Sequence, residues 1–392
     1  MNPVISSIAR TPIGRFNGAY APLKAVDLGA VAIAGALDRS GLSPESVDEV
    51  IFGHVLQAGQ GQITSRQAAV KAGIPMTVPA VTINKVCLSG MTAIQEAANH
   101  IRLGQSTFVV AGGMESMTNA PYVLEGARSG YRMGDQAVVD VMMHDGLFCA
   151  FDSCMMGDSS DRKNDDLRIG RSDQDEWSAR SHERAAAATD SGAFAAEIIP
   201  VEVPQRRGET LVVTEDGGIR RGTTTESLSE LRPAFNPGGT ITAGNASQIS
   251  DGAAAVVVAD RQAAEAAGIP ILAEIVAYGQ VAGPDATLHE RPAEALKVAL
   301  KDAGLETSDL DLVEFNEAFA SVAMWSARML DIDAAKVNIH GGAVALGHPL
   351  GATGARIVVS LINALKQTGG TYGGAALCGG GGQGDALIVK MV

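Results

Sequence analysis

Short apolar runs of strand length alternate with longer segments of helical periodicity through most of this 392-residue chain. Such alternation is typical of α/β layering, in which helices cover a largely parallel sheet. In the first series we expect strands over residues 4–9, 47–52, 81–86 and 108–111 and helices over residues 27–39 and 89–103. A second series begins near residue 271, with strands over residues 312–315, 375–378 and 386–389 and helices over residues 292–303 and 351–365. The length exceeds one ordinary core, so we expect two or three packed units.

The stretch from residue 119 to residue 242 interrupts this alternation and is richer in Asp, Arg, Met and Ser. Its clearest element is a helix near residues 173–188, with Ser172 and Asp175 in capping-box positions. We interpret this stretch as an insertion between two parts of one α/β layer.

The two flanking series share a weak internal repeat of layout, with little residue identity. Cys87 precedes one expected helix, and the strand after that helix runs into glycines at residues 112–113. His348 precedes another helix, and the strand after it runs into glycines at residues 379–382. The repeat suggests two similar halves.

The charge and the polarity of the chain limit the functions that it can have. A formal net charge of −14 argues against nucleic acid as a general partner, although a local cluster of basic side chains or backbone N–H groups can still hold a phosphorylated ligand. No apolar run approaches the roughly 20 residues of a membrane-spanning helix. The N-terminus has the form of neither a signal peptide nor a transit peptide. We therefore expect a cytoplasmic enzyme.

The four cysteines, Cys87, Cys149, Cys154 and Cys378, form no CxxC pair and have no histidine at the spacing of a zinc site. A disulfide scaffold is implausible in a long chain of cytosolic character. We expect individual thiols, either buried as small apolar groups or chemically active, and no metal site.

Cys87 lies between an expected strand and an expected helix, in the segment NKVCLSG (residues 84–90). Unpaired backbone N–H groups and the helix dipole favour an anion at such a position, which would lower the pKa of the thiol and yield a nucleophilic thiolate. From position alone, a buried free cysteine is an equally good interpretation.

His348 stands in the glycine-rich segment GGAVALGHPLGATG (residues 341–354) and is followed by Pro349. Such a loop lets the backbone and the imidazole approach a ligand closely. The alternatives are a helix-start turn with a satisfied surface histidine and a phosphate-cradling loop. The segment contains too many glycines for a plain helix cap, which argues against the first alternative. It also has no Gly-x-Gly-x-x-Gly pattern directly after a strand and no following Lys-Ser/Thr pair, which argues against the second.

Two further segments place polar groups at strand ends. Cys378 precedes four glycines in LCGGGGQG (residues 377–384), which suits a base beside N–H groups that stabilise an oxyanion, or else a hairpin turn. Asn316 and Glu317 lie in EFNEAFA (residues 314–320), between an apolar strand and an apolar helix. Asn316 could donate a hydrogen bond or position a water, but helix capping is the better interpretation of this segment alone.

Taken together, the order and the residue types of these four segments resemble the thiolase family, which comprises acetyl-CoA acetyltransferases and 3-ketoacyl-CoA thiolases. The resemblance spans nearly the whole chain. It also includes ARTPIG (residues 9–14), AGGMESM (residues 111–117), TAGNAS (residues 242–247) and SDGAA (residues 250–254). Agreement by chance on all of these segments, in this order, is not credible.

The resemblance implies the α/β thiolase fold, in which two similar βαβαβαββ halves stack in five layers, αβαβα. Residues 1–118 with residues 243–269 would form the N-terminal half, and residues 270–392 the C-terminal half. Residues 119–242 would form an inserted loop domain that covers coenzyme A and supports assembly into a homotetramer built from dimers.

The resemblance also implies catalytic roles. Cys87 would be the nucleophile that forms an acyl-cysteine, and His348 would take its proton. Cys378 would be the second acid/base, which removes the α-proton of the incoming acetyl-CoA. His348 and Asn316, the latter through a water, would hold one thioester oxygen, and the backbone N–H groups of Cys87 and Gly380 would hold the other. No metal or prosthetic group is expected, because the thioester itself acidifies the α-carbon.

The family pattern further places a set of contacts along the coenzyme A groove, at Arg220, Ser227, Leu228, Leu231, Ala234, Phe235, Ala243, Ser247, Ala318 and Phe319. Arg220 with Arg221 would be the basic cluster that an acidic chain needs for the phosphates. In isolation, a solvated loop arginine is the better interpretation of Arg220.

Two segments depart from the family pattern at the acyl and pantetheine end. Residues 154–157 are Cys-Met-Met-Gly where many acetyl-specific members have Tyr-His-Met-Gly, so Met155 replaces the histidine. Residues 288–292 are LHERP where the family often has Met-Gly-x-Gly-Pro. Both departures bear on acyl-chain preference and leave the catalytic residues in place.

We therefore expect an acyltransferase of fatty acid metabolism that reversibly condenses two acetyl-CoA molecules to acetoacetyl-CoA and CoA by a ping-pong mechanism. The alternative is a degradative 3-ketoacyl-CoA thiolase of broader chain length, and cleavage rates across acetoacetyl-CoA and longer substrates would separate the two. A non-catalytic thiolase-fold protein that binds lipid or coenzyme A would be expected to lack Cys87, His348 or Cys378, and all three are present. A nucleotide-binding oxidoreductase is disfavoured because the Rossmann fingerprint is missing.

Overall fold

The centre of the fold is one ten-stranded mixed sheet, seen in a computed structural model that describes residues 1–205 and 208–392. The strand order is β14-β15-β16-β13-β1-β12-β5-β3-β4, and the short β2 pairs with β12. The strands are β1 (Pro3–Arg10), β2 (Gly14–Arg15), β3 (Glu49–Gly53), β4 (Ala80–Ile83), β5 (Phe108–Ser116), β12 (Ser250–Asp260), β13 (Ala273–Ala282), β14 (Leu312–Phe315), β15 (Tyr372–Gly379) and β16 (Gln383–Met391).

Two halves of this sheet meet where β1 pairs with β13, with Val4 opposite Glu274 and Ile5 opposite Ala273. In the N-terminal half, β12 runs antiparallel between β1 and β5, and β3 lies parallel to β5 and β4. In the C-terminal half, β16 runs antiparallel between β13 and β15, and β14 lies parallel to β15. The two halves therefore repeat one pairing pattern, as the weak sequence repeat suggested.

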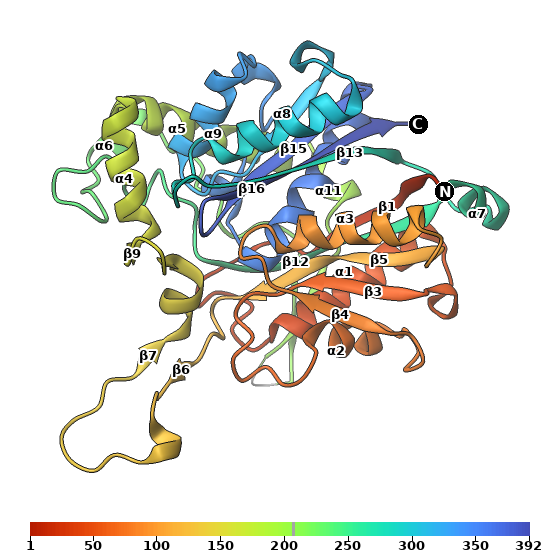
Figure 1. Cartoon of the computed structure of the whole chain (residues 1–392), viewed down its shortest axis with the longest axis horizontal. Coiled ribbons are helices and arrows are strands. Elements are labelled where there is room, and N and C mark those ends of the chain that lie inside the picture. Colours follow the sequence, from red (N-terminus) through yellow and green to blue (C-terminus); the bar gives the residue numbers. More distant parts are fainter. Residues whose placement is uncertain (206–207) are drawn as a thin grey trace.

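Helices form three layers around the two halves of the sheet (Figure 1). The outer helices α1 (Ala25–Ser40) and α2 (Thr64–Lys71) cover the N-terminal strands, and α8 (Arg291–Ala303) and α9 (Ala320–Met329) cover the C-terminal strands. Between the halves, α3 (Ser89–Arg102) packs against α11 (Leu350–Thr368) in the largest apolar core. The result is the expected order αβαβα.

Glycines let the two central helices approach each other closely at their N-terminal ends. A Cβ atom on Gly354 of α11 would lie 2.4 Å from the backbone nitrogen of Met91 in α3. A Cβ atom on Gly113 of β5 would lie 1.9 Å from a backbone oxygen at the start of α11. Any side chain at these positions would force the backbones apart. Because α3 begins just after Cys87 and α11 just after His348, this contact brings the two residues together.

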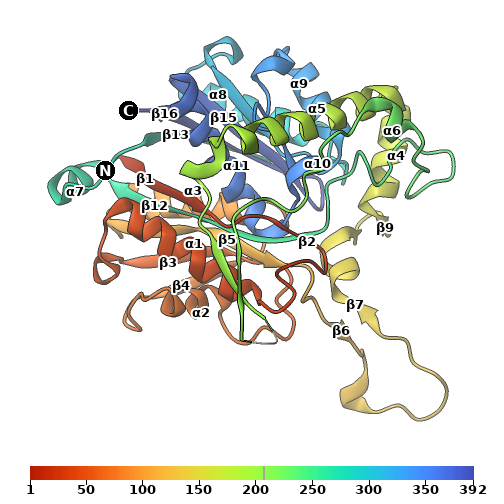
Figure 2. The ribbon, with the colours of Figure 1, turned by 180° about the vertical axis from the view of Figure 1, so that it is seen from behind.

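The insertion between β5 and β12 consists of an arm, helices that lie against the C-terminal half, and small hairpins, one of which packs Val201 and Val203 into the core of the N-terminal half (Figures 1 and 2). The arm (residues 122–140) projects from the body of the molecule, and α5 (Arg171–Asp190) packs against α9 and α10 (Ala343–Leu346). Its elements are β6 (Tyr122–Val123), β7 (Val139–Asp140), β8 (Phe148–Cys149), β9 (Cys154–Met155), α4 (Met156–Leu167), α5 (Arg171–Asp190), β10 (Val201–Pro204), β11 (Thr210–Val213) and α6 (Thr225–Ser229). Among the helices of the described ranges, none has both the length and the hydropathy needed to cross a membrane.

The capping box expected at the start of the insertion helix is wrong. Helix α5 begins at Arg171 with Gly170 as its N-cap, so Ser172 and Asp175 already lie inside the helix. Asp175 instead accepts hydrogen bonds from Arg171 Nε at 2.6 Å and from Asn245 Nδ2 at 3.1 Å. The Asp175 carboxylate, which the local sequence assigned to the helix end, thus makes a long-range contact with Asn245 instead.

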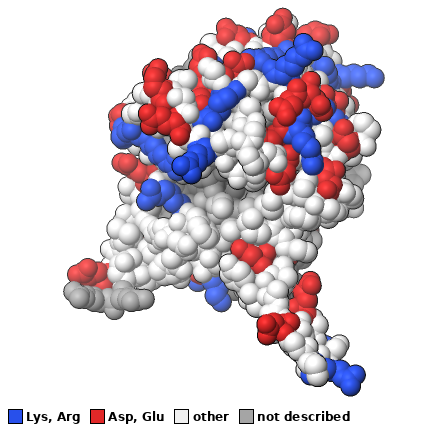
Figure 3. Space-filling view, turned by 90° about the vertical axis from the view of Figure 1, so that its left-hand side faces the viewer, with Lys and Arg blue, Asp and Glu red and all other residues white. Residues whose placement is uncertain are grey.

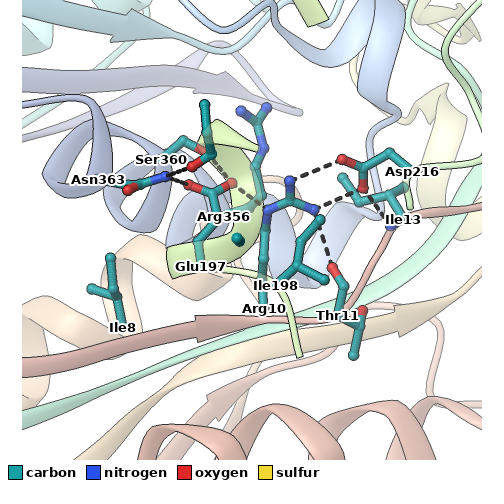
Figure 4. Close-up of polar contacts among 12 residues, drawn as sticks. Ile8, Arg10, Thr11, Ile13, Glu197, Ile198, Asp216, Arg356, Ser360 and Asn363 are labelled. Atoms are coloured by element: carbon teal, nitrogen blue, oxygen red, sulfur yellow. Dashed lines mark hydrogen bonds and ion pairs between the residues drawn. The ribbon is translucent and has the colours of Figure 1, made fainter. Parts of the chain in front are cut away.

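A buried arginine anchors the insertion on the first strand (Figure 4). Arg10 of β1 donates through Nε to Glu197 at 2.6 Å and through its two terminal nitrogens to Asp216 at 2.7 and 2.9 Å. Glu197 also accepts a hydrogen bond from Asn363 of α11 at 2.8 Å. Burial lowers the pKa of Arg10, but the two carboxylates outweigh burial and hold that pKa above its ordinary value. One charged cluster therefore ties the insertion to both halves.

Substitution Arg10→Met should lower the free energy of unfolding by about 3–5 kcal/mol, because it leaves two buried carboxylates without their cation. Equilibrium chemical denaturation measures this change. Arg261→Met is the matched control, since the Arg261 side chain is 24% exposed and pairs with surface carboxylates. We expect the control to cost less than about 1 kcal/mol. Equal losses in the two variants would mean that the Arg10 cluster does not anchor the fold.

Candidate active site

An apolar cavity of about 250 Å³ lies where the two halves of the molecule meet the insertion. Cys87, His348, Cys378 and Gly380 all line this cavity, although they come from distant parts of the chain. Figure 3 shows the face of the molecule that carries the arm, with a hollow that has Lys and Arg side chains along its upper left rim and uncharged side chains below it. The cavity therefore collects the two thiols, the imidazole and the glycine that the sequence singled out.

The turn between β4 and α3 presents Cys87 to the cavity. The strand expected over residues 81–86 ends at Ile83. It cannot continue through Val86, which adopts a left-handed conformation with φ of 50°. Asn84 Oδ1 accepts the Val86 N–H at 3.0 Å, and Ser89 Oγ accepts the Lys85 N–H at 2.8 Å. These side-chain contacts replace the strand hydrogen bonds and turn the backbone into the helix.

His348 faces the sulfur of Cys87, with 3.2 Å between Nε2 and Sγ. On the other side of the ring, Nδ1 lies 2.7 Å from Thr353 Oγ1, and the Thr353 hydroxyl donates to the Pro349 carbonyl at 2.9 Å. Because that hydroxyl has given its one proton away, it accepts from Nδ1–H. This assignment leaves the Nε2 lone pair free to take the thiol proton.

Burial favours the neutral forms of both Cys87 and His348 before substrate binds. It raises the pKa of Cys87 to about 12, although the backbone N–H groups of Cys87 and Gly380 pull in the opposite direction. Burial, and secondarily the charge of Arg356, lowers the pKa of His348 to about 3. The expectation that the helix start would hold the thiol ionised is therefore wrong, since desolvation outweighs the donors around the sulfur. The pair is a thiol hydrogen-bonded to a neutral imidazole.

Cys378 and Gly380 reach the cavity from the end of β15. Cys378 pairs with Gly384 of β16, and its side chain is 1% exposed. Burial raises the pKa of Cys378 well above its ordinary value, and negative charge on Cys87 would raise it further. The backbone N–H of Gly380 points at the Cys87 sulfur. The second thiol is thus also protonated at rest, beside the first.

Asn316 is fully buried, and neither of its amide atoms has a hydrogen-bond partner in the described part of the chain. Its backbone N–H donates to the carbonyl of Ala376 in β15 at 3.1 Å, which places it beside the strand that carries Cys378. Helix α9 begins at Ala320 with Phe319 as its N-cap. The capping interpretation of Asn316 is therefore wrong, and Asn316 is not among the residues that line the cavity.

Glu317 has a structural role. Its carboxylate accepts hydrogen bonds from Trp177 Nε1 at 2.9 Å, Ser181 Oγ at 2.8 Å and the Val344 backbone N–H at 3.0 Å. These contacts join α5 of the insertion to the segment that leads into His348.

Six of the ten expected coenzyme A contacts line the cavity, namely Ala234, Phe235, Ala243, Ser247, Ala318 and Phe319. Leu228 and Leu231 lie just behind this wall, since a Cβ atom on Gly244 would come within 2.6 Å of both side chains. Arg220 and Ser227 are exposed and lie outside the cavity. Arg221 forms an exposed ion pair with Asp190 at 2.7 Å, so the expected basic cluster is partly neutralised.

Sequence reasoning missed Thr353 and part of the apolar wall. Thr353 lies one helical turn beyond the histidine in a segment that was already singled out, but nothing in its residue type indicated a contact with the ring. Met143 and Leu147 of the insertion also line the wall and were not expected, whereas Met156 and Leu288 come from the two segments that the sequence placed at the acyl end. Methionine and leucine in an insertion are ordinary core residues, so no local signal separates lining residues from the rest.

The comparisons with known proteins agree with this geometry. Family models match the thiolase N-terminal domain over residues 3–262 and the thiolase C-terminal domain over residues 269–391. A probable acetyl-CoA acetyltransferase of Mycobacterium leprae is 53% identical over 99% of both chains, and the acetyl-CoA acetyltransferase of Escherichia coli is 48% identical over 100% of this chain and 99% of its own. The crystal structure of the Bacillus anthracis acetyl-CoA acetyltransferase superimposes with a TM-score of 0.97 at 40% identity, covering 100% of this chain and 99% of that chain. This protein belongs to the thiolase family.

Proposed function

We propose that this protein is an acetyl-CoA C-acetyltransferase that transfers acyl groups between coenzyme A thioesters through an acyl-Cys87 intermediate. The observation that carries the proposal is the 3.2 Å contact between Cys87 Sγ and His348 Nε2 in a cavity that also holds Cys378 and Gly380. The names of relatives 45–53% identical to this chain favour acetyl-CoA as the substrate.

In the first half-reaction, Cys87 attacks the thioester carbonyl as its proton moves to Nε2 of His348. The carbonyl oxygen gains negative charge, and the N–H groups of Cys87 and Gly380 stabilise it. When the tetrahedral intermediate collapses, the carbon–sulfur bond to coenzyme A breaks and the leaving thiolate takes the proton from His348. The product is acetyl-Cys87 and free CoA.

In the second half-reaction, a base must remove a proton from the methyl group of the next acetyl-CoA. Cys378 is the candidate: its thiol proton first moves to the imidazole of His348, which is neutral again after CoA leaves, and the resulting thiolate takes the α-proton. Asn316, through a water, and His348 would hold the enolate oxygen. The enolate carbon then attacks the carbonyl of acetyl-Cys87, the bond to the Cys87 sulfur breaks, and that sulfur takes the proton back from His348, which releases acetoacetyl-CoA and restores both thiols. Thiolytic cleavage runs through the same steps in reverse.

We also assign roles to the parts of the chain. Residues 119–242 would cover coenzyme A, while residues 1–118 with 243–269 and residues 270–392 would supply the two catalytic halves. The arm exposes large apolar side chains, including Tyr122 at 64%, Val138 at 60% and Met133 at 93%. Such side chains favour contact with a second copy, which supports the expected homotetramer. The location in the cytoplasm and the role in fatty acid metabolism stay predictions from the sequence.

The first test is the acyl-enzyme itself. After brief mixing with acetyl-CoA, intact-protein mass spectrometry should show one added acetyl group, which peptide mapping should place on Cys87. Cys87→Ala should form no adduct, and His348→Asn should form it at least about 100-fold more slowly, because no base takes the thiol proton. An adduct on another residue, or none, would contradict the proposal.

The second test distinguishes the role of Cys378 from that of Cys87. Cys378→Ala should still form acetyl-Cys87, but its condensation and thiolysis rates should fall by about 100- to 10,000-fold, because the proton transfer at the α-carbon is lost. Cys149→Ala is the matched control, since Cys149 is also buried but does not line the cavity. We expect the control to retain both steps. Normal condensation by Cys378→Ala would remove Cys378 from the mechanism.

A further inference from the structure

A buried ion pair joins the turn that carries Cys87 to strand β16. Nζ of Lys85 lies 2.8 and 3.0 Å from the two carboxylate oxygens of Asp385. The hydroxyl of Thr92, in the first turn of α3, donates to the same carboxylate at 3.0 Å. The side chains of Lys85 and Asp385 are only 15% and 0% exposed. Lys85 is therefore held in one place and is not a solvated surface charge.

The pair connects the two halves of the molecule beside the reacting groups. Lys85 belongs to the turn of the N-terminal half and directly precedes Val86 and Cys87. Asp385 lies in the C-terminal half, opposite Leu377, and its neighbour Gly384 lies opposite Cys378. One ion pair thus links the backbone around the nucleophile to the strand pair that carries the second thiol.

The same two segments supply the two backbone donors at the Cys87 sulfur. One N–H belongs to Cys87 and the other to Gly380. The spacing of these donors depends on how the turn sits against the end of β15. The Leu88 side chain packs tightly on the strand there, since a Cβ atom on Gly379 would lie 2.5 Å from Leu88 Cγ. Small movements of the turn would therefore change the donor geometry directly.

The turn also needs support from outside itself. Val86 is β-branched and has φ of 50°, a strained conformation that such residues rarely adopt unless the surroundings enforce it. Asn84 and Ser89 hold the shape of the turn from within. Lys85 instead holds the turn against the opposite half of the molecule.

We propose that Lys85 and Asp385 are a positioning pair for acyl transfer, which sets the separation of the Cys87 and Gly380 N–H groups that stabilise the oxyanion. The inference rests on the proposed role of Cys87 as the acyl acceptor. Neither side chain lines the cavity, so both act through the backbone. Because donor geometry matters most when charge develops on the substrate oxygen, the pair affects the transition state more than substrate binding.

Two variants test the pair in the full-length protein. Lys85→Met removes the cation, whereas Asp385→Asn keeps the size of the side chain and its hydrogen bond from Thr92 while removing the charge. We expect kcat to fall by about 10- to 100-fold, more in Lys85→Met than in Asp385→Asn, while KM for acetyl-CoA changes less than about threefold. Lys85→Arg keeps the charge and should recover part of the rate.

The decisive measurement is the rate constant of acetyl-Cys87 formation, measured by rapid quenching and mass spectrometry below the unfolding temperature and normalised to the fraction of protein that can be acetylated. This rate constant should fall in parallel with kcat. A purely structural role would instead lower only the fraction of protein that can be acetylated, or the melting temperature. Lys71→Met, which removes an exposed lysine paired with Asp27, is the matched control and should acetylate at the normal rate. If Lys85→Met does not fold, the acetylation rate of Asp385→Asn tests the proposal instead.

Acetylation rates within about twofold of the wild type in the folded variants would overturn the positioning role, as would an equal loss in the Lys71→Met control. A wild-type protein that forms no acetyl-Cys87 would instead overturn the proposed function. The two failures are therefore distinguishable in one experiment.

Discussion

The close contact between the N-terminal ends of α3 and α11 is the constraint on which the rest of the site depends. Cys87 and His348 are 261 residues apart in the chain, and each precedes one of these helices. Glycines remove the side chains that would separate the two helix ends, so the sulfur and the imidazole meet at hydrogen-bond distance. A cavity built in this way belongs to neither half alone. The insertion then closes it with an apolar wall and is itself held in place by the buried charges of Arg10 and Glu317.

Burial determines the chemistry of this site more than the helix ends do. Desolvation favours the neutral forms of Cys87, His348 and Cys378, so no charge is present before the substrate arrives. The proton transfer from sulfur to imidazole then coincides with bond formation to the thioester, where the N–H groups of Cys87 and Gly380 receive the new charge. An apolar cavity also limits the access of water, which would otherwise hydrolyse the acyl intermediate.

Much of this arrangement could be predicted from the sequence, because glycine-rich segments around single reactive residues indicate where backbones approach a ligand. The strand and helix order followed from the apolar periodicity and the two halves from the repeat of layout, whereas the joint roles of Cys87, His348 and Cys378 followed from the resemblance to the thiolase family. Three features depend instead on burial or on contacts that the residue types alone do not indicate. The pKa of Cys87 depends on total burial, the tautomer of His348 on Thr353, and the placement of the turn on Asp385, and none of these is encoded by local pattern. Asp175 and Asn316 mislead because each has the residue type of a helix cap, whereas the Asp175 carboxylate makes a long-range contact and the buried Asn316 amide caps no helix.

The neutral resting pair is tested most directly by a pH titration of thiolate absorbance in the ultraviolet, taken as the difference between the wild type and Cys87→Ala. With the pKa of Cys87 raised to about 12, this difference should show no ionisation of Cys87 from about pH 6 to about pH 9. A thiolate signal that is already complete near pH 7 would contradict the account, because it would mean that the sulfur is ionised before substrate binds.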